Sequence, residues 1–286
     1  MFNDIGSIYK EIRESKNLTQ AAVCKNILSR SNLASFESNR SIPSYEKMAF
    51  LLRQLDVTFE EFAYICNHYK PDKRQSILLH AMNTISIADV KKIQSLLEKT
   101  QDYLKAYPED VPIHRLQQKL EITLHIWEHD FDKQAHKLAE KIWEELQTYD
   151  TWYESDLKML TTILFHFPVD TIHLITDRIL DTLERYKDYK NIQPSQFSLL
   201  ANLSTVYLYE NYSEDCQRIT TVLYDLSKRL KRYDYLGIAH IRLGICQKDF
   251  ERIQKGLDIL DLTDETQLLT GMKKEVAHFH PTFPLD

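Results

Sequence analysis

Glycine and proline are scarce in this chain, with only 5 glycines and 8 prolines among 286 residues. Strand-rich proteins need many tight turns, which these residues favour, so their scarcity predicts long helices joined by short connections. A phosphate-binding loop built from repeated glycines is excluded for the same reason. No run of about 18 apolar residues occurs, so no membrane partner is expected. The composition predicts an all-α protein.

Cysteines are also few and widely separated. Cys24, Cys66, Cys216 and Cys246 form no CxxC pair, so we expect free thiols, as in cytoplasmic proteins. The first ten residues contain Asp4 and no apolar run, so no secretory signal is expected. Both observations predict a cytoplasmic location.

A basic excess is missing too, because the net charge is -6. The distribution is uneven, however. Residues 1–66 carry eight basic and eight acidic groups, so the negative excess lies later in the chain. Between residues 15 and 40 there are four basic residues and a single acid, Glu37, which gives this window a net charge of +3. A small basic face near the N-terminus is therefore expected to attract an anionic partner such as DNA.

Apolar residues at helical spacing predict five short helices near the N-terminus. Their expected spans are 4–15, 19–26, 30–38, 44–55 and 58–68. Thr58 and Glu61 have the spacing of a capping box for the fifth helix. We expect a DNA-binding domain over 1–66 and a linker over 67–86 that contains a hinge helix at about 72–83.

From residue 87 to residue 286 the pattern is helix, short turn, helix. Each helix with its turn takes about 20 residues and a pair takes about 40, which is typical of helical repeats. Small residues that would let paired helices approach closely are Ala135, Ala139, Ala201 and Ala239. Stacked helix pairs present an extended concave surface. The segment 87–286 is therefore predicted to be a degenerate, tetratricopeptide-like helical-repeat domain.

The first 66 residues resemble the helix-turn-helix domain that phage repressors and many bacterial regulators share. Residues 28–37, Leu-Ser-Arg-Ser-Asn-Leu-Ala-Ser-Phe-Glu, are similar to the Rgg branch of Gram-positive, peptide-responsive (RNPP-type) regulators. The segment from Trp152 to Leu157 resembles that family's central W-x-x-x-[E/D]-L region. The resemblance implies a homodimeric transcription regulator for quorum sensing. Its partners would be double-stranded promoter DNA and a short hydrophobic signalling peptide.

The resemblance also assigns a DNA-binding role to particular residues. The DNA-binding candidates are Thr19, Gln20, Ser29, Arg30, Ser31, Asn32, Ser35 and Arg40. Residues 30–35 form the half of a recognition helix that enters the major groove, where Arg can bind guanine and Asn can bind adenine. In related domains Gln20 bonds a phosphate and steers the recognition helix, and Glu37 ties that helix to its neighbours through Arg13. The alternative is an ordinary capped, solvated helix.

Peptide binding needs groups that bond an extended backbone and pockets that accept apolar side chains. The peptide-binding candidates are Trp152, Tyr153, Glu154, Asp156, Phe165, Arg185, Asn202, Tyr207 and Tyr209. Asn202 lies in an otherwise apolar helix, and its amide can both donate and accept a hydrogen bond. The alternatives are that Asn202 bonds a neighbouring helix and that the aromatic residues belong to the core. Many family members carry Arg where this chain has Tyr153, so the ligand's charge preference stays open.

One short pattern points to an enzyme. Residues His125–His129 fit H-x-x-E-H, the inverted zinc-protease motif. Histidines four residues apart on a helix can share a metal. However, the apolar stripe of Leu120, Leu124 and Trp127 suits a repeat helix, and no further ligand can be singled out. We therefore expect no metal, no cofactor and no enzymatic activity. The alternative to peptide sensing is a repeat domain that binds a protein partner or a small molecule.

Overall fold

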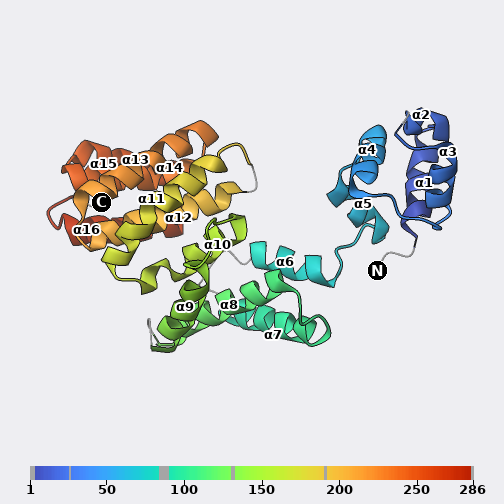
Figure 1. Ribbon diagram of the computed structural model, residues 1–286. Helices are drawn as coiled ribbons and strands as arrows, with labels where there is room; N and C mark the ends of the chain where they lie inside the picture. Colours follow the sequence, from blue (N-terminus) through green and yellow to red (C-terminus); the bar gives the residue numbers. More distant parts are fainter. Residues whose placement is uncertain (1–3, 26, 84–89, 130–132, 190–191, 285–286) are drawn as a thin grey trace. The chain divides into compact units, whose positions relative to one another are not determined.

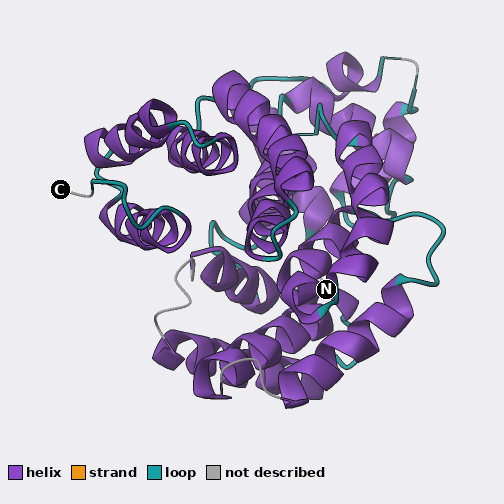
Figure 2. Cartoon of the chain, turned by 90° about the vertical axis from the view of Figure 1, so that its left-hand side faces the viewer, coloured by secondary structure: helices purple, strands orange, loops and turns teal. Residues whose placement is uncertain are grey.

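The computed structural model describes residues 4–25, 27–83, 90–129, 133–189 and 192–284. These residues form helices and loops and contain no strand (Figure 2). The chain divides into two compact units, Met1–Ile85 with Lys105–Tyr107 and Ser86–Leu104 with Pro108–Asp286. The predicted all-α fold class is confirmed. None of the helices in the described residues has the length and apolar character that crossing a membrane requires.

The first unit contains all five helices predicted near the N-terminus. They are α1 (Ile5–Ser15), α2 (Gln20–Cys24), α3 (Arg30–Glu37), α4 (Tyr45–Leu55) and α5 (Phe59–Cys66), followed by α6 (Lys73–Asn83) (Figure 1). The Thr58 hydroxyl accepts a hydrogen bond from the Glu61 backbone N–H at 3.0 Å, so it caps α5 as its spacing predicts. The helix predicted over 72–83 is present as α6.

The core of the first unit holds α3 against the other helices. Tyr9 of α1, Leu33 and Phe36 of α3, and Leu51 of α4 are each 0–1% exposed. The rings of Tyr9 and Phe36 lie 5.4 Å apart. Burial of a large apolar side chain stabilises a fold by roughly 1.5–3 kcal/mol. Because Leu33 and Phe36 point inward, the other face of α3 is left to solvent.

The start of α1 packs directly on the end of α3. A Cβ atom at Gly6 would lie 1.8 Å from the Phe36 carbonyl oxygen, so only glycine fits there. Asn39 follows α3 with a positive φ of 55°, a conformation that Asn tolerates. Its side-chain oxygen accepts hydrogen bonds from the backbone N–H groups of Gly6 at 2.8 Å and Ser7 at 3.3 Å. Asn39 thus satisfies free donors at the start of α1 and fixes α1 against α3.

From residue 90 onward the described chain is a succession of helices joined by short connections, and all of it except Lys105–Tyr107 belongs to the second unit. They are α7 (Val90–Ala106), α8 (Val111–His129), α9 (Lys133–Leu146), α10 (Glu154–Ile163), η1 (Leu164–His166), α11 (Val169–Arg185), α12 (Gln193–Tyr209), α13 (Ser213–Leu230), α14 (Tyr233–Gln247), α15 (Phe250–Leu262) and α16 (Thr266–Phe279) (Figure 1). The predicted pattern of helix, short turn and helix is confirmed over the described residues.

Contacts between alternate helices join α10, α12, α14 and α16 in one row. The Asn202 amide of α12 donates to the Thr161 carbonyl of α10 at 3.0 Å. The Arg242 guanidinium of α14 donates to the Ala201 carbonyl of α12 at 2.7 Å and bonds Glu275 of α16. We call these four helices the inner row. Helices α11, α13 and α15 alternate with them along the chain.

Small residues lie at several helix contacts of this unit. Of the four alanines expected to let paired helices approach, Ala135, Ala139 and Ala239 are fully buried and Ala201 is half-buried. Helices α14 and α15 approach closely at two glycines, where a Cβ atom at Gly256 would lie 2.7 Å from the Gly237 carbonyl oxygen. At that distance the two backbones are nearly in contact, which explains why this pair uses glycine rather than alanine.

Candidate nucleic-acid interface

Two capping residues mark the starts of α2 and α3. The Thr19 hydroxyl accepts from the Ala22 N–H at 3.1 Å at the start of α2. The Ser29 hydroxyl accepts from the Asn32 N–H at 3.2 Å at the start of α3. Helix α2 ends where Lys25 adopts a left-handed conformation with φ of 35°. These local signals are common at helix ends, so α3 begins at Arg30 for reasons that the sequence itself contains.

A buried ion pair lies beneath α3. The Arg13 guanidinium donates to both Glu37 carboxylate oxygens, at 2.6 Å and 2.9 Å, and also to the Leu18 carbonyl at 2.6 Å. The Gln20 amide donates to the same carboxylate at 2.8 Å. The hydrogen bond to Glu37 raises the pKa of Arg13 above its usual value, although burial opposes the shift. Glu37 therefore ties α3 to α1 and α2, which confirms its predicted structural role. Gln20 positions α3 through Glu37.

The structure leaves most of the DNA-binding candidates accessible. Thr19, Ser29, Arg30, Ser31, Asn32 and Arg40 are exposed, and Gln20 and Ser35 are half-buried. The four residues from Ser29 to Asn32 lie together at the start of α3, while Arg40 follows the end of that helix. The Arg40 guanidinium donates to the Ser38 hydroxyl at 2.8 Å. Contact of these side chains with DNA remains a prediction.

The charge of this surface is more positive than the sequence window implies. Glu37, its only acid, is buried and paired, so its carboxylate does not face solvent. Lys25, Arg30 and Arg40 stay exposed. A hollow of about 490 Å³ lies between α2 and α3 and is lined by Lys25, Ser29 and Arg30, among others. Exposed cations around a hollow concentrate a positive potential that attracts phosphate.

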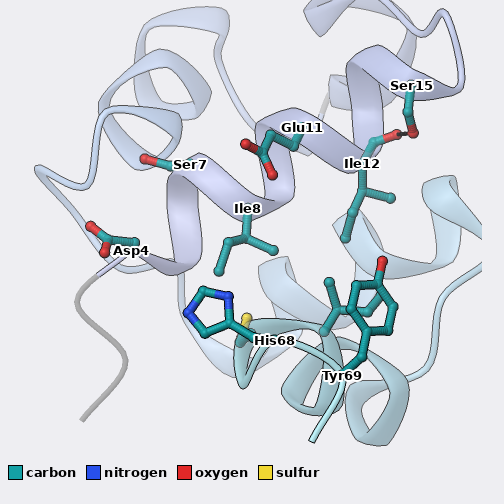
Figure 3. Close-up of a pocket in the computed structure, with 10 residues that line it drawn as sticks. Asp4, Ser7, Ile8, Glu11, Ile12, Ser15, His68 and Tyr69 are labelled. Carbon is teal, nitrogen blue, oxygen red and sulfur yellow. Dashed lines mark hydrogen bonds between the residues drawn. The ribbon is translucent and has the colours of Figure 1, made fainter.

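Another surface of the first unit has a different character. A pocket of about 660 Å³ lies between α1 and the residues that follow α5. Figure 3 shows Ile8 of α1 next to His68 and Ile12 next to Tyr69, and the carboxylates of Asp4 and Glu11 belong to the same lining. None of the DNA-binding candidates lines this pocket. Its carboxylates would repel a phosphate backbone, so the surface around Arg30 is the better interface for DNA.

Three of the peptide-binding candidates are buried. Trp152 and Tyr207 are 1% and 0% exposed, and the Trp152 indole N–H donates to the Leu146 carbonyl at 2.8 Å. Asp156 is 3% exposed and accepts from the Arg115 guanidinium at 2.5 Å and the Tyr153 backbone N–H at 2.8 Å. The structure places these side chains in the core, the alternative that the sequence left open for the aromatic residues. Asp156 is already neutralised by Arg115, so the structure does not favour it as an anchor for a peptide terminus.

The other peptide-binding candidates reach the surface to different degrees. Tyr153, Phe165, Arg185 and Tyr209 are exposed, and Glu154 and Asn202 are half-buried. Glu154 pairs with Lys158 at 2.5 Å. Tyr209 packs on Phe279 with ring centroids 5.1 Å apart. Asn202 is in the inner row and uses one N–H to bond Thr161, which is the alternative interpretation of that residue. The structure brings Tyr153 and Glu154 together at the start of α10 and does not bring Arg185 to the inner row.

The zinc motif falls at an edge of the described part of the chain. Helix α8 includes His125, as expected for a repeat helix, and the side chains of residues 126–129 lie outside the described residues. Among the residues described, no three His, Cys, Asp or Glu side chains are grouped to hold a metal ion.

Residues 10–62 match the protein family described as helix-turn-helix. This match covers α2, the turn and α3, whose geometry is given above. Residues 10–62 form a helix-turn-helix domain. In such domains the second helix of the motif, here α3, is the one that lies in the major groove. The family match does not extend into the helical-repeat unit.

Solved structures resemble the chain over nearly its whole length. A protein from Listeria monocytogenes EGD-e that is assigned as a transcriptional regulator has a TM-score of 0.76 at 17% identity, with 98% of each chain covered. The SHP pheromone receptor Rgg2 of Streptococcus dysgalactiae has a TM-score of 0.67 at 17% identity, covering 97% of this chain and 99% of the receptor. ComR from S. thermophilus, solved with DNA and its signalling peptide ComS, has a TM-score of 0.62 at 16% identity, covering 96% and 99%.

The helix-turn-helix domain and the repeat unit thus occur together in the order found in these regulators. At such identities the similarity concerns the fold. It confirms the predicted combination of a helix-turn-helix domain with a helical-repeat unit, and it supports the resemblance to Rgg-type regulators.

Proposed function

We propose that the protein is a sequence-specific, DNA-binding transcription regulator of the Rgg type, active in the cytoplasm as a homodimer. Its helix-turn-helix domain binds promoter DNA and its repeat unit, within residues 87–286, senses a short hydrophobic peptide and dimerises. The observation that carries this proposal is the start of α3. Arg30, Ser31 and Asn32 are exposed there, on a helix that a buried ion pair holds in place.

In this proposal the exposed side chains form two groups, one that contacts bases and one that contacts phosphates. Arg30 and Asn32 contact base edges, where each good contact contributes about 1–3 kcal/mol of discrimination. The hydroxyl groups of Thr19 and Ser29, and the cations Lys25 and Arg40, lie along the same motif and contact phosphates, which fix the register without reading sequence. The buried bond between Gln20 and Glu37 keeps α3 in position as the domain meets the duplex.

The first prediction concerns Arg30. Arg30→Ala is expected to weaken binding to a duplex selected from a random library by about 5- to 150-fold, the equivalent of one base contact. Fluorescence anisotropy with labelled duplex measures the affinity at fixed salt. Arg53→Ala is the matched control because Arg53 is an exposed arginine of α4 outside the motif. Unchanged affinity for Arg30→Ala, or an equal loss for Arg53→Ala, would overturn the assigned role of α3.

Two observations support a peptide as the signal. Helix α12 of the inner row carries the exposed ring of Tyr209, which packs on Phe279, and the half-buried Asn202, which bonds Thr161 with one of its side-chain N–H groups. ComR and Rgg2, which share the fold, are a regulator solved with its signalling peptide and a pheromone receptor. A peptide that prefers one arrangement of the dimer would shift the population toward that arrangement and change DNA affinity.

The second prediction follows from thermodynamic linkage. A peptide that changes DNA affinity by some factor must have its own affinity changed by DNA by the same factor. We expect a short hydrophobic peptide, chosen from a library by binding to the full chain, to bind with different affinity in the presence and absence of the selected duplex. Isothermal titration calorimetry measures both affinities. Equal affinities would show that the repeat unit does not signal to the DNA-binding domain through that peptide.

A further inference from the structure

A hollow in the repeat unit lies between helices α11, α12 and α13. Its volume is about 480 Å³, within the range of small-molecule sites in proteins. The lining includes five apolar side chains, Leu180, Leu183, Leu200, Val222 and Leu226. Leu200 is 1% exposed and Leu226 is 8% exposed, whereas Val222 is 41% exposed. The hollow therefore has an apolar floor that opens toward solvent.

One polar group of this lining lacks a partner. Gln196 is 4% exposed, and its side-chain N–H donates to the Leu183 carbonyl at 3.2 Å. That bond fixes the orientation of the amide, because a carbonyl oxygen accepts only from the nitrogen side. The Gln196 Oε1 atom is then a buried acceptor with no hydrogen bond. A buried acceptor without a donor costs stability, and a ligand that brings an N–H group removes that cost.

The rim of the hollow favours a positive ligand. It carries the carboxylates of Asp181, Glu184 and Asp225 and the cations of Lys187 and Arg229. Lys187 is paired with Glu184 at 2.6 Å. Asp181 and Asp225 are both exposed, and neither forms an ion pair with another of the described residues. The rim therefore has a net charge of −1 and two carboxylates that can face a bound cation.

This hollow lies on the side of α12 that faces away from Asn202. Gln196 and Leu200 are one turn apart and lie on the same side of α12, whereas Asn202 follows Leu200 by two residues. At 3.6 residues per turn, two residues correspond to a rotation of about 200° around the helix axis. Asn202 contacts α10, while Gln196 contacts α11. A ligand in the hollow and a peptide on the inner row would occupy different sides of α12.

We propose that the hollow between α11, α12 and α13 binds a small amphipathic cation, namely a protonated primary amine carried by an apolar group. The apolar group packs on Leu180, Leu200 and Leu226. The ammonium donates one N–H to Gln196 Oε1 and places its charge beside Asp181 and Asp225. This site does not depend on the proposed response to a peptide, because it uses the opposite side of α12.

The test uses the full chain and n-hexylamine as the probe at pH 7, with 1-hexanol as its uncharged analogue. Methyl NMR of the leucine side chains follows each titration. We expect the methyl shifts to saturate with hexylamine. We expect the affinity for hexanol to be at least about tenfold lower, because hexanol lacks the charged N–H donor that bonds Gln196 Oε1. Equal affinity for the two probes, or no saturation with hexylamine, would overturn the proposal.

Two variants locate the site. Gln196→Leu is expected to weaken hexylamine binding about tenfold or more, because the variant removes the buried acceptor that has no partner in the described structure. This variant also removes the donor to Leu183, so the surface variant Asp181→Asn/Asp225→Asn gives an independent measure and should weaken binding several-fold without unfolding. Asp258→Asn/Asp261→Asn makes the same charge change on exposed positions of α15 and should leave the affinity unchanged. Equal affinity in all variants would place the amine elsewhere.

Discussion

Replacing Glu37 with alanine is expected to destabilise the helix-turn-helix domain by about 3–5 kcal/mol, because it leaves the buried Arg13 guanidinium without its carboxylate. Arg13 and Glu37 are joined by two hydrogen bonds, and their side chains are 7% and 3% exposed. The Gln20 amide loses the same acceptor. A loss of this size is a large share of the roughly 5–15 kcal/mol that typically stabilises a domain. The variant should therefore lose DNA binding as well.

Native-state hydrogen exchange in α1, α3 and α4 measures this change in the intact chain. Glu14→Ala is the matched control, because Glu14 also contacts Arg13, at 3.2 Å, but is 55% exposed. Exposed ion pairs contribute about 0–1 kcal/mol to stability, so Glu14→Ala should change the free energy of unfolding by at most about 1 kcal/mol. The double variant Arg13→Met/Glu37→Leu should regain most of the stability, because it removes both buried charges together. Similar losses for Glu37→Ala and Glu14→Ala would refute the structural role of Glu37.

Replacing Arg242 with methionine is expected to destabilise the repeat unit by a similar amount, about 3–5 kcal/mol. Its guanidinium donates to the two Glu275 oxygens at 2.9 Å and 3.0 Å, and to the Ser204 hydroxyl at 2.6 Å. Burial alone would lower the pKa of Arg242, but the Glu275 carboxylate outweighs it and the net shift is upward. Removing Arg242 leaves Glu275 buried and unpaired, and it releases a contact that joins α12, α14 and α16.

Denaturant unfolding followed by tryptophan fluorescence measures this effect, because Trp127, Trp143 and Trp152 all lie in the repeat unit. Arg218→Met is the control, since Arg218 pairs with Asp177 at 2.8 Å on the surface. The control should change the free energy of unfolding by at most about 1 kcal/mol. The double variant Arg242→Met/Glu275→Leu should recover stability. If Arg242→Met behaves like the control, the buried pair does not hold the three helices together.

The helices could be predicted from the sequence because the signals for them are local. Thr19, Ser29 and Thr58 are each within three residues of the N–H groups that they cap. Apolar spacing of three and four residues then sets which face is buried. The exposed start of α3 follows from the same reasoning, since Leu33 and Phe36 point inward and leave Arg30 to solvent.

Side-chain burial in the repeat unit could not be predicted in the same way. Trp152, Tyr207 and Asp156 look like binding residues in the sequence, but their burial depends on partners far along the chain. Asp156 is paired with Arg115, 41 residues away, and Tyr207 bonds Thr176, 31 residues away. The spacing of residues within one helix contains no information on such distant pairs.

Some residues that matter to the fold have partners that the sequence does not indicate. Asn39 fixes α1 through its side chain, and nothing within α3 indicates this contact. The sequence does indicate that Arg242 needs a partner. It is the single arginine within Gly237–Ile245, which are all buried, and a buried arginine needs a buried acid. Its partner Glu275 is 33 residues later, so the need was predictable while the partner was not.

The start of α3 is the surface that we propose binds DNA, and the rest of the proposed function depends on it. Hydrogen exchange of the full chain, measured with and without a tightly bound duplex selected from a random library, tests this directly. We expect slower exchange across residues 29–35 in the complex, and no slowing around the acidic pocket lined by Asp4, Glu11 and His68. Unchanged exchange at residues 29–35 in a saturated complex, with slowing at that pocket or in the repeat unit, would contradict it.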